Sequence, residues 1–276
     1  MFLKTMLFLP VFFLGSLLVP ADDTLTVLDC GAGSCLQEFF GRVFSKEDVA
    51  LPQDLSINIT AAGTDVVNAI SAENVVIADD GLLELKLPEN CLKSVYAYIP
   101  VVLAVNKSNP LDDVNPDTLQ RIYSGRAGDW SRVGGKSGKI VLAGYPGDSA
   151  VGRVFRKKVM QQDLSGKVEP DINKTIAPDL IICQTPEAAA ALVQSSGSVI
   201  VFGGAGLLKN AAGKYKILKV NGILPSKENL LSGRYKLFSE HSIISSRNKP
   251  PAKLAALLDF LRLSAAKNSR DMLPVK

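Results

Sequence analysis

Residues 101–155 constrain the fold most, because an apolar run, a helix, a second apolar run and a second helix follow one another within them. The first run, 101–105, has the length of a buried strand. Asn115, followed directly by proline, is a typical helix N-cap. The second run, 139–143, leads into a turn and a helix that begins near Ser149. Residues 101–155 therefore alternate between predicted strands and predicted helices.

The same strand-to-loop transition recurs earlier in the chain. Strands are predicted at 25–28, 55–59 and 75–78, and each leads into a segment rich in Gly, Thr or Asp. A loop that opens a helix is a generic anion site, because the first helical amides lack internal partners and the helix dipole is positive there. Since most such loops only connect a strand to a helix, the pattern by itself does not establish a ligand.

Residues 1–21 have the features of a secretory signal. Lys4 precedes an apolar core at 6–19. Small or short residues, Val19-Pro20-Ala21, then occupy the positions where a signal peptide is cleaved. The alternative is a membrane anchor, but the core is short for a span and Pro10 interrupts it. We expect cleavage near Ala21 and a mature protein that is periplasmic or otherwise secreted.

The charge of the mature chain argues against nucleic acid as a partner. Loss of Lys4 leaves 30 Lys+Arg against 27 Asp+Glu, a net charge of +3. The basic residues are scattered, without the basic and aromatic stripe typical of nucleic-acid binding.

Four cysteines in an exported chain allow three disulfide connectivities, and Cys30 with Cys35 would close a small local loop. The other two are Cys91 and Cys183. No further Cys or His lies at a metal-like spacing, and His241 is the only histidine, so no metal site is expected. The sequence also has no paired nucleophile and base and no G-x-S-x-G, which argues against an enzyme.

Several motifs occur together in a specific order. They are N-x-x-N-P at 106–110, Ile-Tyr-Ser-Gly at 122–125, Trp130, Gly-Gly at 134–135 and Gly-Asp-Ser at 147–149. In this order they resemble the phosphate-binding proteins of bacterial phosphate ABC transporters, which are type II periplasmic binding proteins. A second match lies at 220–235.

The resemblance implies an α/β fold of two lobes, each a mixed sheet flanked by helices, with a ligand cleft between them. It divides the chain into a signal peptide (1–21), a first part of lobe 1 (22–100), lobe 2 (101–202) and a return segment of lobe 1 (203–276). The chain would cross between lobes near 99–101 and 202–206, and the two crossings would form a hinge.

The resemblance also implies a ligand set at the ends of the strands. Its members are Gly33, Ser34, Thr64, Asp80, Ser149 and Ala150. Four positions depart from the family pattern: Cys35 replaces a threonine, Tyr145 replaces an arginine, and Ala150-Val151 replace Gly-Thr. Arg153 lies nearby and could help only if the loop differs from that of the family; otherwise it is a surface arginine.

The resulting functional hypothesis is an exported solute-binding protein for phosphate or a related small oxyanion. It would feed an ABC permease as a monomer, with no cofactor and no catalysis. The alternative is the same fold used as a sensor or as a module of an envelope or secretion apparatus, with an altered or lost pocket.

Overall fold

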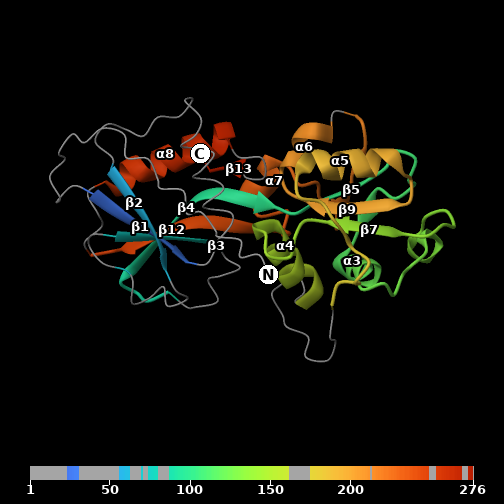
Figure 1. Cartoon of the computed structure of the whole chain (residues 1–276), viewed down its shortest axis with the longest axis horizontal. Coiled ribbons are helices and arrows are strands. Elements are labelled where there is room, and N and C mark those ends of the chain that lie inside the picture. Colours follow the sequence, from blue (N-terminus) through green and yellow to red (C-terminus); the bar gives the residue numbers. More distant parts are fainter. Residues whose placement is uncertain are drawn as a thin grey trace, which may run out of the picture.

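The computed structural model describes residues 24–30, 56–62, 70, 74–79, 87–161, 175–211, 213–248, 253–268 and 273–275. Two main sheets lie at opposite ends of the long axis, with helices against them (Figure 1). The predicted signal peptide lies outside the described residues. Within the described ranges, no helix is both long and apolar enough to cross a membrane.

The first sheet has six strands in the order β13-β4-β12-β3-β1-β2. β1 pairs in parallel with β2 and β3, and β12 runs antiparallel to β3 and β4. Helix α8 contacts β4 and β13. The bounds are β1 (Thr24–Cys30), β2 (Ser56–Ala62), β3 (Asn74–Asp79), β4 (Cys91–Pro100), β12 (Phe238–Ser246), α8 (Leu254–Asn268) and β13 (Leu273–Pro274).

The second sheet has five strands in the order β10-β5-β9-β7-β8, and β7 runs parallel to both neighbours. Helices α5 and α6 lie above this sheet in Figure 1, and α3 and α4 lie below it. The strands are β5 (Val102–Val105), β7 (Val141–Gly144), β8 (Ile181–Ile182), β9 (Val199–Gly203) and β10 (Lys216–Ile217). The helices are α3 (Pro116–Tyr123), α4 (Ala150–Phe155), α5 (Pro186–Ser195), α6 (Gly206–Ala211) and α7 (Lys227–Leu231), with a 3-10 turn at Trp130–Val133 and a π-helix at Arg156–Gln161. A small parallel pair joins β6 (Asp113–Val114) to β11 (Lys219–Val220).

Helix α3 forms as its sequence predicts. The Asn115 side chain caps it by accepting a bond from the Thr118 amide at 2.8 Å. Its apolar face is buried in the core, and the chain turns away at Gly125, whose φ of +77° suits glycine. All four residues of β5 are buried as well, so the predicted strand and helix are confirmed.

The N-x-x-N-P motif has a structural role in the second lobe. The Asn106 amide donates to the carbonyls of Val193 and Gln194, which lie in the last turn of α5. Asn109 is buried, and its side-chain oxygen accepts a bond from the Leu111 amide at 2.9 Å. The carbonyls at the end of α5 and the Leu111 amide thus receive hydrogen-bond partners from these side chains.

The chain crosses between the two sheets at two adjacent points. The first is Val101, between β4 and β5, and the second lies at Leu237, just before β12. The Val101 amide donates to the Leu237 carbonyl at 2.9 Å, and the buried Tyr235 hydroxyl donates to the Val101 carbonyl at 2.6 Å. The two crossing segments are therefore bonded side by side.

The second crossing lies later than the sequence predicts. We expected it near 202–206, but β10 pairs with β5 and β11 pairs with β6, so the chain stays with the five-stranded sheet beyond β9. The expectation failed because the strand pattern at 199–203 resembles a return strand, while β10 and β11 have only two residues each. Strands this short leave almost no periodicity to read.

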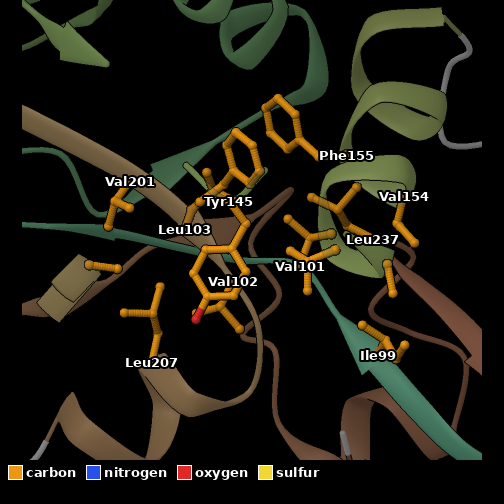
Figure 2. Packing of buried hydrophobic residues seen from close by; sticks show 14 of the residues in the cluster. Ile99, Val101, Val102, Leu103, Tyr145, Val154, Phe155, Val201, Leu207 and Leu237 are labelled. Carbon is orange, nitrogen blue, oxygen red and sulfur yellow. The ribbon is translucent and has the colours of Figure 1, made fainter. Parts of the chain in front are cut away.

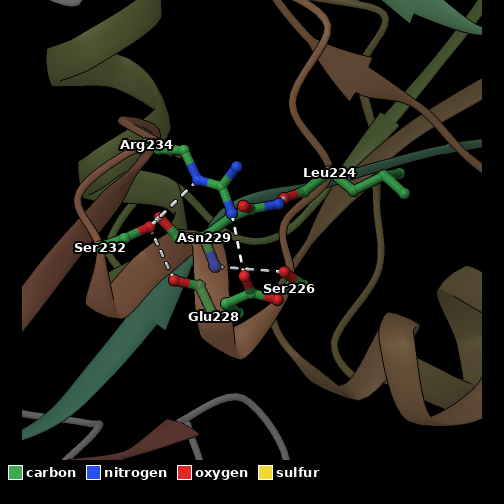
Figure 3. Close-up of polar contacts among 6 residues, drawn as sticks. All are labelled: Leu224, Ser226, Glu228, Asn229, Ser232 and Arg234. Carbon is green, nitrogen blue, oxygen red and sulfur yellow. Dashed lines mark hydrogen bonds and ion pairs between the residues drawn. The ribbon is translucent and has the colours of Figure 1, made fainter.

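Residues 224–234 lead into the second crossing and are held by polar contacts (Figure 3). Ser226 caps α7 by accepting from the Asn229 amide at 3.2 Å, and Asn229 donates its side-chain amide to the Leu224 carbonyl. An ion pair of 3.1 Å joins Arg234 to Glu228. Ser226 thus caps α7 from the position directly before its first residue.

One apolar cluster runs through the crossing and includes buried residues of both sheets. Figure 2 shows Ile99, Val101 and Leu237 packed near Val154 of α4. Helix α4 contacts β4 of the first sheet and β9 of the second. It therefore lies at the junction of the two lobes.

Candidate functional site

Three parallel strands of the first sheet end at one edge. The last residues of β1 and β2, Cys30 and Ala62, are paired in register, and Asp29 pairs with Ile77, two residues before the end of β3. The chain therefore leaves the sheet at one edge after all three strands. Ligands in open α/β sheets bind at such carboxyl ends.

Four predicted ligand residues directly follow these strands but lie outside the described residues. They are Gly33, Ser34, Thr64 and Asp80. In the sequence, each of them follows the end of β1, β2 or β3 by five residues or fewer.

The other two predicted residues, Ser149 and Ala150, lie where β7 leads into α4. Ser149 is the N-cap of α4: its hydroxyl oxygen accepts a bond from the Gly152 amide at 3.0 Å. The same hydroxyl donates to the Pro146 carbonyl at 2.6 Å. The serine thus closes the loop onto the helix, and Ala150 is the first helical residue and is buried.

Gly152 allows the loop to pack this closely. A Cβ at Gly152 would overlap the Pro146 carbonyl oxygen and would lie 3.0 Å from the Cα of Gly147. The family pattern has glycine directly after the serine, whereas this chain has it three positions after Ser149. A glycine next to Ser149 is therefore not required for the loop to meet the helix.

Aromatic rings support the strand ends beneath the loop. Phe155 and Phe202 stack with their ring centroids 4.0 Å apart, and Tyr123 meets both edge-on. The Tyr123 hydroxyl donates to the Ala143 carbonyl at 3.1 Å, and burial raises the pKa of this phenol well above its usual value. Rigid packing of this kind keeps a binding loop in one conformation.

Tyr145 does not supply the charge of the arginine that it replaces. Its ring is buried, and a Cβ at Gly203 would lie 2.9 Å from the Cε1 of Tyr145. Figure 2 shows the side chain in the apolar cluster near Leu207. The loop therefore receives apolar packing at this position and no positive charge.

Two arginines of the following helix contact the loop instead. Arg153 donates through Nη1 to the Asp148 carbonyl. The guanidinium of Arg156 lies against Gly147. The sequence pattern pointed to Arg153 and not to Arg156. The only signal for Arg156 in the sequence is its position four residues after Gly152, on the same helix face.

The two described cysteine thiols are free and buried, at Cys91 and Cys183. Burial raises the pKa of the Cys183 thiol, and the Cys183 amide donates to the Gly144 carbonyl at 2.9 Å. A Cys30–Cys35 bond, one of the pairings that the sequence allows, involves residues whose side chains lie outside the description. Among the described residues, no three or more potential metal ligands gather.

Two sheets joined by two adjacent crossings, with parallel strands that end in loops, define a two-lobe binding protein. A family model described as a PBP superfamily domain matches residues 56–264, and the chain belongs to this superfamily. The resemblance to type II periplasmic binding proteins and the α/β two-lobe fold are thereby confirmed.

The similar proteins include phosphate-binding proteins. The phosphate-binding protein PstS of Bacillus subtilis (strain 168) is 26% identical over 168 residues, which is 60% of this chain and 50% of that protein, so the match spans half the length of this relative. The crystal structure of PstS from Borrelia burgdorferi superposes with a TM-score of 0.67 at 17% identity, covering 92% of this chain and 99% of that one. The crystal structure of an ABC-type phosphate transport receptor from Vibrio cholerae superposes with a TM-score of 0.64 at 15% identity, covering 88% of this chain and 95% of that one.

Proposed function

We propose that this protein is an exported solute-binding protein that holds phosphate, or a related small oxyanion, between its lobes for an ABC permease. The observation that carries the proposal is the shared edge of β1, β2 and β3, from which the predicted anion-binding segments begin. The names of the similar proteins support phosphate as the ligand. The proposed protein is a monomer without cofactor or catalytic activity, and it does not bind nucleic acid.

The proposed binding site uses hydrogen-bond donors from both lobes and one acceptor. Loop amides near Gly33 and Ser34, the Thr64 hydroxyl and the first amides of α4 donate to the anion oxygens. Asp80 accepts the proton that phosphate carries at neutral pH. Because sulfate carries no such proton, it would face the carboxylate without a compensating bond.

We propose export with cleavage near Ala21, and lobes that follow the strand assignment. The first lobe then comprises 22–100 and the residues after Leu237, and the intervening segment forms the second. The pairing of β10 with β5 supports this later return over one at 203. Mass spectrometry of protein from the native host should find Asp22 as the first residue, and an intact 1–21 in a membrane fraction would contradict export.

The test of function is calorimetry of the mature protein, freed of bound anion, against phosphate and sulfate. The parent should prefer phosphate about ten- to a hundredfold, since one unpaired buried polar group costs about 1–3 kcal/mol. Asp80→Asn should narrow this preference. Ser149→Ala should weaken both anions alike, because it loosens the loop at the α4 N-terminus.

Thr185→Ala is the matched control for Ser149→Ala. Thr185 caps α5 with the same geometry, accepting from the Ala188 amide at 3.2 Å, but it lies outside the proposed site. Its loss should leave both affinities unchanged. An unchanged preference in Asp80→Asn would exclude Asp80 from the site, and a parent that binds no oxyanion would favour the sensor or assembly module.

A further inference from the structure

The guanidinium of Arg156 lies over the loop that precedes α4. A Cβ added to Gly147 would overlap Nη2 of Arg156 and would lie 3.1 Å from its Cζ. Side chains in a helix lean toward its N-terminus, so Arg156 extends back past Gly152 to a residue that precedes the Ser149 cap. A positive charge therefore lies at the loop, although no arginine occurs within 145–149.

Arg156 carries a charge that no carboxylate in the described part of the chain neutralises. Arg156 is exposed, and none of the described carboxylates forms an ion pair with it. Arg153 differs, because its guanidinium is bonded to the Asp148 carbonyl and holds the loop to the helix. Of these two arginines, Arg156 is the one whose position suits an anion bound beside the loop.

We propose that Arg156 is the residue that supplies positive charge to the bound oxyanion, in place of the arginine that Tyr145 has replaced. This inference rests on the proposed function and adds a ligand-binding residue to it. A guanidinium presents two parallel N–H donors that match two oxygens of a tetrahedral anion. Gly147 is part of this arrangement, because any side chain there would displace the guanidinium.

The first experiment measures phosphate affinity by calorimetry for the parent, Arg156→Gln and Arg156→Lys at two salt concentrations. Because a charge-assisted contact is lost, the phosphate affinity of Arg156→Gln should be about ten- to a hundredfold lower than that of the parent. The affinity of this variant should also depend less on salt. The phosphate affinity of Arg156→Lys should lie between those of the parent and Arg156→Gln, since lysine keeps the charge but lacks the two parallel N–H donors of a guanidinium.

Arg126→Gln is the matched control, because it makes the same change of net charge on the same lobe. Arg126 is exposed, lies just after α3 and donates through Nε to the Ser124 hydroxyl at 3.1 Å. Its affinity for phosphate should equal that of the parent. Equal weakening in both variants would mean that only net charge matters and would overturn the role of Arg156.

A second variant, Gly147→Ala, tests the contact itself. The new methyl group would displace the guanidinium, so Gly147→Ala should weaken binding nearly as much as Arg156→Gln, and the double variant should be no weaker than Arg156→Gln alone. Additive losses would overturn the proposed contact. Thermal unfolding of each variant identifies losses that come from misfolding.

The remaining outcomes separate this inference from the proposed function. If the parent binds phosphate and Arg156→Gln binds it equally well, the inference fails and the proposed function stands. If the parent binds neither phosphate nor sulfate, both fail.

Discussion

Tyr235 connects the two segments that cross between the sheets, through its bond to the Val101 carbonyl. Tyr235→Phe keeps the ring and leaves that carbonyl without this donor, so the free energy of unfolding should fall by about 1–2 kcal/mol. Urea titration followed by circular dichroism measures the loss. Tyr98→Phe is the control, since the Tyr98 hydroxyl has no hydrogen-bond partner among the described residues, and it should change stability by less than about 0.5 kcal/mol.

The pH dependence of stability has a definite sign at this residue. Burial raises the pKa of Tyr235 far above 10, whereas the unfolded phenol ionises near 10. Above pH 10 the unfolded state therefore loses a proton that the folded state keeps, and stability falls as pH rises. The fall should be smaller in Tyr235→Phe, and equal slopes in the two proteins would contradict the burial of this phenol.

Gly144 ends β7 where the ring of Phe202 crosses it. A Cβ there would overlap the ring, so Gly144→Ala should cost about 1–3 kcal/mol through forced repacking. Gly128→Ala serves as the control, because its nearest neighbour would be an ordinary contact at 4.0 Å. Equal unfolding midpoints for the two variants would show that the aromatic stack moves without cost.

The residue scale also shows where sequence reasoning ends. Capping by Asn115, Ser149 and Thr185 could be predicted, because a cap depends on neighbours within four residues. The contact of Arg156 with Gly147 could not, because it depends on the path of the loop over Gly152. Helix ends can therefore be predicted from nearby residues, whereas the charged side chain that lies at a site depends on tertiary packing.

At the scale of elements, α4 and the π-helix that follows it connect the loop to the crossing. Lys158 donates to the Lys236 carbonyl at 3.2 Å, and its ammonium lies 4.9 Å above the Phe238 ring. One end of this continuous helical segment therefore meets the candidate ligand loop, and the other meets the return strand. The change from α to π pitch at Arg156–Gln161 has no signature in the local sequence.

Cys91 is the first residue of β4, and Cys183 directly follows β8. Because both thiols are buried, we expect both to react slowly. Cys91 and Cys183 are 6% and 4% exposed, and the raised pKa of Cys183 keeps less of it as the reactive thiolate. Iodoacetamide at pH 8 should leave both unmodified until urea is added. Peptide mapping reads out the result, and rapid labelling of either cysteine in the native protein would contradict its burial.

At the scale of the whole molecule, the five-stranded sheet is built from one continuous stretch of the chain. Every strand of the five-stranded sheet lies between residues 102 and 217. A fragment of residues 101–237 should therefore unfold cooperatively, with the buried Trp130, the only tryptophan of the chain, as its fluorescent reporter.

A fragment of residues 101–202 ends where the sequence placed the boundary, and it lacks β10 and α6. It should show the red-shifted emission of an exposed indole and no cooperative transition. Equal behaviour of the two fragments would restore the earlier boundary.

The order of strands in the first sheet affects when that sheet can form during synthesis. β12 lies between β4 and β3, so residues 238–246 join two groups of strands that do not pair directly with each other. The ribosome makes these residues only after the complete inserted lobe, while β1, β2 and β3 wait for their antiparallel neighbour. A nascent chain therefore cannot complete its N-terminal sheet until residues 238–246 have been made, long after the synthesis of β1, β2 and β3.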